Sequence, residues 1–185
     1  MKRYYAGVGS RRAPASVEHR FKEVVERLND LDYIARSGGA PGPDTWVERY
    51  ARESQIFLPY KKFNRNRSIL CSPTLEAFDE AAKVHPVWDR LPSPSRYLHA
   101  RNAHQVLGPC LVDDSRGWYR PSDFVVCWTP GAKTVGGTAT AIRIAERHRI
   151  PVFNLAHDDD GDLFRTERVI DQILAYAHEC IARGA

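Results

Sequence analysis

Short apolar runs alternate with stretches of helical periodicity along the chain. The runs predict buried strands and the stretches predict helices between them. The expected strands cover residues 2–8, 33–35, 55–59, 123–128 and 151–155. The expected helices cover about 17–31 with Ser16 as N-cap, a segment from Pro43, 73–84 after Ser72, 96–107 after Ser95, 138–148 and 164–182. This alternation predicts an α/β fold, a Rossmann-like, mostly parallel sheet with helices on both faces.

The length of 185 residues suits one compact domain over residues 1–185. The stretch at about 61–121 contains several prolines and has the weakest periodicity, so we expect an irregular insertion there that contains two helices. The longest apolar runs have five residues, whereas a membrane span needs about 20. With no signal-like leader and four scattered cysteines, the sequence predicts a cytoplasmic protein with free thiols and no membrane association.

Charge gives a weak indication of a polyanionic partner. Lys and Arg number 27 against 23 Asp and Glu, which leaves a net charge of +4. The basic run of residues 61–67 surrounds Phe63, a composition typical of a contact to single-stranded nucleic acid, although a solvated loop has the same composition. His85, His99 and His104 do not have metal-ligand spacing, so we expect neither a metal nor a cofactor.

Three glycine-rich turns follow expected strands, at residues 7–12, 38–42 and 131–138. In an open parallel sheet such turns lie at the carboxyl edge, so we expect them to converge on one ligand. Glycine allows a close approach of the backbone, and a helix N-terminus offers amide donors to a phosphate. Ordinary turn chemistry is the alternative for any single turn. A P-loop and a complete dinucleotide-binding fingerprint are both missing from the sequence.

Three segments resemble the SLOG superfamily: AGVGSR at 6–11, RSGGAPGPD at 36–44, and TPG with GGT between 129 and 138. This superfamily includes the DNA-processing protein A (DprA, Smf) family and the LOG phosphoribohydrolases. The resemblance covers residues 4–60 and 94–155 and is strongest to small single-domain DprA-like proteins of phages. It implies a nucleotide or phosphorylated nucleoside derivative as ligand. Because such relatives are commonly dimers, it also implies a homo-oligomer.

The sequence departs from the LOG-like signature PGGxGTxxE at its catalytic glutamate. Thr140 or Ala141 stands where that glutamate is expected, and a shifted alignment offers Ile142 or Arg143. Whether the protein is an enzyme therefore stays open. A carboxylate from elsewhere, Asp44 or one in the pair at 113–114, could serve an N-glycosidic hydrolase or transferase.

The leading hypothesis is nucleotide binding at the carboxyl edge, with glycines and hydroxyls as phosphate donors and arginines as counter-charges. The helix with Arg101 is similar to the arginine-containing helix that faces the nucleotide in LOG-like proteins, and Trp128 could stack on a base. The alternatives are a LOG-like hydrolase with Asp44 as its acid, and a DprA-like protein that binds single-stranded DNA. The candidate ligand-binding residues are Gly7, Gly9, Ser10, Arg11, Ser37, Gly38, Gly39, Asp44, Arg101, Asn102, Trp128, Gly136, Gly137 and Thr138.

Overall fold

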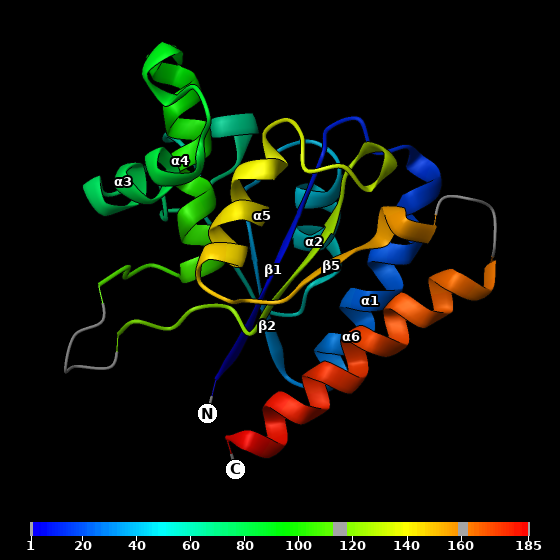
Figure 1. The fold of residues 1–185 in the computed structure, drawn as a ribbon. Helices are drawn as coiled ribbons and strands as arrows, with labels where there is room; N and C mark the ends of the chain where they lie inside the picture. Colours follow the sequence, from blue (N-terminus) through cyan, green and yellow to red (C-terminus); the bar gives the residue numbers. More distant parts are fainter. Residues whose placement is uncertain (1, 113–117, 159–162, 185) are drawn as a thin grey trace.

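The protein is described here by a computed structural model of residues 2–112, 118–158 and 163–184. Five parallel strands form one sheet in the order β3-β2-β1-β4-β5 (Figure 1). The strands are β1 (Arg3–Gly9), β2 (Tyr33–Ser37), β3 (Ser54–Ile56), β4 (Phe124–Trp128) and β5 (Val152–Asn154). The predicted α/β class is therefore confirmed, and the described strands are all parallel.

Helices cover both faces of the sheet, as expected. They are α1 (Glu18–Asp30), α2 (Pro43–Tyr50), α3 (Leu75–Val84), α4 (Ser93–Leu107), α5 (Thr138–Arg147) and α6 (Leu163–Arg183). Helices α1, α2 and α6 pack on one face, α4 and α5 pack on the other, and α3 lies outside against α4 (Figure 1). No helix in the described ranges is both long enough and apolar enough to cross a bilayer.

The two apolar cores follow from the alternation of side chains along the strands. In β4, Phe124 and Val126 belong to the core beneath α1, α2 and α6, while Val125 and Cys127 belong to the core beneath α4 and α5. All five residues of β4 are buried. A strand that is covered on both faces needs a continuous apolar run, which explains why residues 123–128 could be predicted as a strand from the sequence.

Several helix starts differ from their predicted positions. Ser16 is not the cap of α1, because a single 3-10 turn at Ala15–Val17 precedes the helix and the N-cap residue Val17 makes no side-chain capping bond. Helix α3 starts after Thr74, whose hydroxyl accepts from the Ala77 amide at 3.4 Å. Helix α4 starts at Ser93, because Pro94 is compatible with a first turn. The stretch at about 61–121 contains α3 and α4, and α4 packs against β1 in the core.

The segment after β3 lies along the continuation of that edge strand. The Leu58 amide donates to the Leu70 carbonyl at 2.7 Å, and the Ser68 hydroxyl donates to the Ile56 carbonyl at 2.6 Å. Leu58 also forms an isolated parallel bridge with Cys71. Residues 68–71 therefore hydrogen-bond to main-chain groups of Ile56 and Leu58 at this edge of the sheet.

Candidate functional site

A crevice of about 530 Å³ opens where the strand order reverses, at the carboxyl ends of β1 and β4. The Ser10 amide donates to the Trp128 carbonyl at 3.0 Å and joins these two strand ends. The turns after β1, β2 and β4 all contribute to the crevice, and α4 forms another wall. Of the predicted ligand-binding residues, the following line it: Gly9, Ser10, Arg11, Asp44, Arg101, Asn102, Gly136, Gly137 and Thr138.

The turn before α5 presents an open backbone to the crevice. Gly136 has a positive φ of 71°, and a Cβ added at Gly136 or Gly137 would meet no atom within 4 Å. Asn102 on α4 holds the turn in place, because its Nδ2 donates to the Gly137 carbonyl at 2.9 Å. The first amides of a helix have no partner within the helix, so this end of α5 suits an anion.

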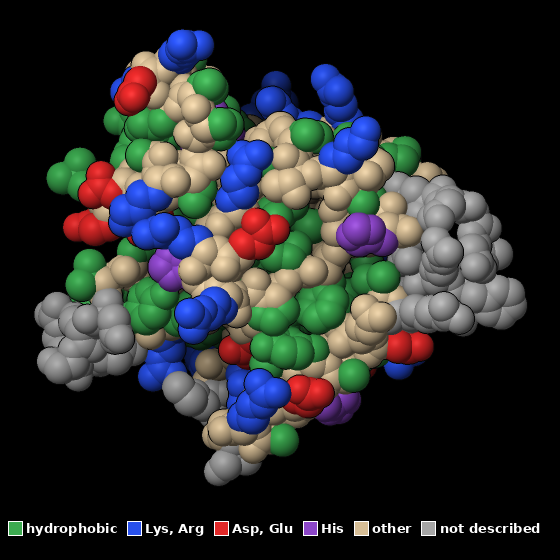
Figure 2. Space-filling model, in the orientation of Figure 1, with side chains coloured by type: hydrophobic (Ala, Val, Ile, Leu, Met, Phe, Trp, Pro, Cys, Tyr) green, Lys and Arg blue, Asp and Glu red, His purple; other side chains and the backbone are tan. Residues whose placement is uncertain are grey.

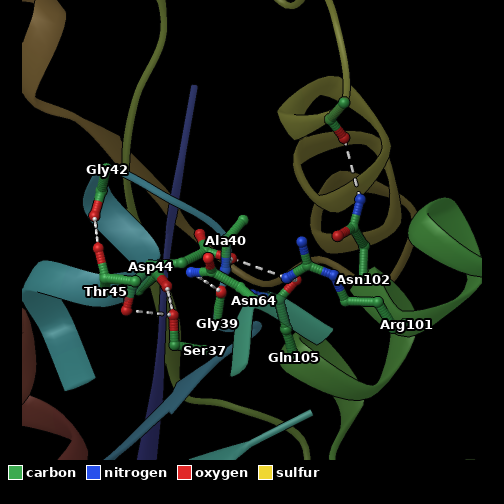
Figure 3. A network of polar contacts seen from close by, with 12 residues as sticks. Ser37, Gly39, Ala40, Gly42, Asp44, Thr45, Asn64, Arg101, Asn102 and Gln105 are labelled. Atoms are coloured by element: carbon green, nitrogen blue, oxygen red, sulfur yellow. Dashed lines mark hydrogen bonds and ion pairs between the residues drawn. The ribbon is translucent and has the colours of Figure 1, made fainter. Parts of the chain in front are cut away.

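A buried ion pair forms the inner wall of the crevice. Arg101 Nη1 lies 2.8 Å from Asp44 Oδ2 and donates to Gln105 Oε1 at 2.8 Å (Figure 3). Asp44 Oδ2 also accepts from the Ala40 amide at 3.4 Å. Gly38 makes room for the guanidinium, because a Cβ there would lie 1.1 Å from Arg101 Nη1. Asp44 and Arg101, which the sequence assigned separate ligand roles, thus bind each other.

Two donors near this ion pair have no partner in the part of the chain that the structure describes. Arg101 Nε and Gln105 Nε2 are buried and make no hydrogen bond with any described residue. Both side chains line the crevice. Buried polar groups are nearly always paired in native proteins, so these two donors are available to a water molecule or to another acceptor that reaches them.

Two exposed arginines, Arg11 and Arg12, stand at the rim of the crevice. Neither forms an ion pair with a carboxylate in the described ranges. Figure 2 shows Lys and Arg side chains at the end of the molecule toward which the strands run. The uncompensated charge makes this rim attractive to polyanions.

His99 on α4 also lines the crevice, and sequence reasoning had considered it only as a metal ligand. Its Nδ1 lies 2.7 Å from Thr140 Oγ1, and its ring centroid lies 4.4 Å from that of His85. Burial, with smaller contributions from the positive charges of His85 and Arg101, lowers the pKa of His99 to about 4. The imidazole is therefore neutral at physiological pH.

This low pKa predicts a loss of stability in acid. Between about pH 6.5 and pH 4 the unfolded chain binds a proton at His99 that the folded chain does not bind, so the free energy of unfolding falls as the pH falls. With allowance for solvent screening, we expect roughly 1–2 kcal/mol from this residue. Thermal melts across this range check the prediction. His99→Gln should make stability depend less on pH. Some pH dependence should remain, because burial also lowers the pKa of His104. An unchanged pH profile in the variant would contradict the assignment to His99.

Five predicted ligand contacts do not line the crevice: Gly7, Ser37, Gly38, Gly39 and Trp128. The Ser37 hydroxyl contacts the main-chain oxygens of Gly7 at 2.8 Å and Asp44 at 3.2 Å. It therefore fastens β2 to β1 and to the start of α2. Trp128 is 5% exposed and its side chain belongs to the core beneath α1 and α2, because it follows the alternation of Phe124 and Val126.

Sequence reasoning missed Phe63 and Gln105 as residues of the crevice. Gln105 could have been found from its spacing, since it lies one helical turn after Arg101 on α4. Phe63 comes from the loop after β3, where no periodicity indicates the direction of a side chain. Its position within a basic run was the available signal.

The described crevice residues include a single carboxylate, Asp44, and its Oδ2 is bound to Arg101. Thr140 is buried in α5, and Ala141 lines the crevice without supplying an acid. The candidate carboxylates at 113–114 lie outside the described residues. General acid–base cleavage needs a group that exchanges a proton with the substrate, and an ion-paired carboxylate is poorly suited to donate one.

Comparison with known proteins identifies the fold. No family model and no curated protein sequence matches the chain. Solved structures do match it. One is DNA processing protein A from Helicobacter pylori, described for its mode of binding single-stranded DNA, at 18% identity with a TM-score of 0.54 over 82% of this chain. Another is DprA from Streptococcus pneumoniae, at 16% identity with a TM-score of 0.52 over 100% of this chain. The chain spans 64% and 57% of their lengths. It has a DprA-like fold.

Proposed function

We propose that the chain binds single-stranded DNA through its phosphate backbone, with one phosphate seated in the crevice. The observation that carries this proposal is the pair of buried donors, Arg101 Nε and Gln105 Nε2, that line the crevice without a partner among the described residues. The open amides at the start of α5 add further donors. A phosphate has enough acceptor oxygens to serve several such donors at once.

The rim favours a chain of phosphates over a single one. Arg11 and Arg12 lie at the rim of the crevice, are exposed and form no ion pair in the described ranges. They can therefore contact the phosphates on either side of the one bound in the crevice. The fold shared with a Helicobacter pylori protein described for single-stranded DNA binding supports the same reading. Contacts to the backbone alone predict binding with little sequence preference.

Fluorescence anisotropy of a labelled oligothymidylate tests the proposal. Affinity should fall steeply with salt, and Arg11→Ala with Arg12→Ala should lower the slope of log K against log salt by about 1.4, because each phosphate contact on a single strand contributes about 0.7. Arg27→Ala with Arg149→Ala is the matched control, since both cations are exposed, form no ion pair in the described ranges and lie near the amino edge of the sheet, at the end of α1 and just after α5. Equal losses in both double variants, or no binding by the wild type at low salt, would contradict the proposal.

A free phosphorylated nucleoside is the second candidate ligand. The crevice volume of about 530 Å³ falls within the usual range for small-molecule sites, about 300–1,000 Å³. A deoxynucleoside monophosphate that displaces the oligonucleotide at a far lower concentration than inorganic phosphate would favour this candidate. Release of free base during that experiment, abolished by Asp44→Asn, would indicate N-glycosidic cleavage.

A further inference from the structure

A loop of mixed basic and aromatic character, residues 60–67, adjoins the crevice. Phe63 lines the crevice. The ring of Tyr60 packs edge-on against Phe63 with centroids 5.4 Å apart, and Tyr60 is 48% exposed. Two aromatic side chains therefore lie at the mouth of the crevice on its β3 side, where an unstacked base could rest on them.

Four cations of this loop are uncompensated among the described residues. Lys61, Lys62, Arg65 and Arg67 are all exposed, and none forms an ion pair or a side-chain hydrogen bond within the ranges that the structure describes. Elsewhere many cations are compensated, as in the contacts of Arg52 with Asp30 and Asp32 and of Arg183 with Glu179. The loop thus concentrates positive charge that the fold itself does not use.

The loop is held in a fixed shape. Lys62, Asn64 and Arg65 have positive φ angles of 64°, 48° and 60°, and non-glycine residues in this region cost roughly 1–3 kcal/mol each. Asn64 Nδ2 donates to the Gly39 carbonyl at 3.0 Å (Figure 3), and Asn66 Nδ2 donates to Glu48 at 2.8 Å. These bonds anchor the loop to the turn after β2 and to α2. A preorganised loop loses less entropy when it binds a partner.

A wide, open groove of about 900 Å³ lies on the other side of the loop. Asn64, Arg65 and Arg67 line this groove, whereas Phe63 lines the crevice. The crevice and the groove are therefore neighbours, separated by the Phe63–Asn64 link and the first turn of α2. The groove also contains one carboxylate, Glu48, and both of its oxygens accept from Asn66.

We propose that this groove is a second contact site for the same single strand, an inference that rests on the proposed function. A strand with one phosphate in the crevice crosses Phe63 and Tyr60, stacks a base there, and enters the groove, where Arg65 and Arg67 bind the following phosphates. The surface recognises a single strand, because only unpaired bases expose a face to the aromatic rings. The protein then binds strands too long for the crevice more tightly than short ones.

The test compares two oligothymidylates, one of about two nucleotides that places a single phosphate in the crevice and one of about twelve that reaches the groove. Arg65→Ala with Arg67→Ala should weaken binding of the long strand roughly tenfold and lower its salt slope by about 1.4. The same variant should leave the short strand unaffected. Tyr60→Ala provides an uncharged variant, which should weaken the long strand through the loss of a stacked base. Circular dichroism melts confirm that each variant is folded.

The outcomes separate this inference from the proposed function. Loss of long-strand affinity alone supports the groove. Unchanged long-strand affinity in both variants, while Arg11→Ala with Arg12→Ala still weakens binding, overturns the groove and leaves the crevice in place. Equal weakening by the control pair Arg27→Ala and Arg149→Ala shows only general electrostatic attraction and also overturns the groove. A wild-type protein that binds neither strand overturns both.

Discussion

Replacing Asp44 with Ala is expected to lower the free energy of unfolding by about 3–5 kcal/mol, because it leaves the guanidinium of Arg101 buried without its counter-charge. The side chains of both residues are less than a tenth exposed, so water cannot take over the role of the carboxylate. The Ala40 amide loses its acceptor as well. Chemical denaturation of the variant and the wild type measures the difference.

A paired variant separates the loss of charge balance from the loss of volume. Asp44→Leu together with Arg101→Met removes both charges, and replacement of a buried ion pair by apolar residues is often neutral. We therefore expect the double variant to recover most of the stability lost in Asp44→Ala, and to lose the affinity for DNA that Arg101 supplies. A double variant as unstable as the single one would show that the ion pair is not the source of the effect.

Gly38→Ala is expected to cost about 2–4 kcal/mol of stability, although it adds a single methyl group at a buried turn. The new Cβ would lie 1.1 Å from Arg101 Nη1, so the guanidinium has to leave its place beside Asp44. The clash is with a flexible side chain, and the cost arises from the ion pair that the movement breaks. Denaturant titration of the folded protein measures it.

Gly137→Ala is the matched control at the same crevice. A Cβ at this position meets nothing within 4 Å and the φ angle is −63°, so stability should change by less than about 0.5 kcal/mol. Combining Gly38→Ala with Asp44→Ala extends the test, because both substitutions break the same ion pair. The double variant should therefore lose much less unfolding free energy than the two single losses added together. Full additivity would refute the shared cause.

The sequence was sufficient to predict the convergence of the turns, because the carboxyl ends of parallel strands meet at one edge. Gly9, Ser10 and Gly137 were placed by that rule alone, and the structure brings them to one crevice. The assignment needs only strand order and direction. For the same reason the rule predicts where the backbone of each turn lies and says nothing of the side-chain contacts.

Side-chain roles were harder to predict, since they depend on which neighbours compete for a group. Asp44 and Arg101 are 57 positions apart, and no local pattern indicates that they pair with each other. Trp128 ends a strand at the correct edge, but the alternation along β4 directs it into the core. Phe63 lies in a loop without periodicity, so its place at the crevice follows only from the hydrogen bonds that anchor the loop.

The segment that lies beside the β3 border has a consequence for contacts between copies of the protein. An uncovered edge strand is a template with which a strand of another polypeptide can pair, and such pairing is a common start of fibril growth. Here the Leu58 amide donates to the Leu70 carbonyl, and the Ile56 carbonyl accepts from the Ser68 hydroxyl of the same molecule. A neighbouring copy therefore finds these groups of Ile56 and Leu58 already hydrogen-bonded, which shortens the stretch on which a foreign strand could pair.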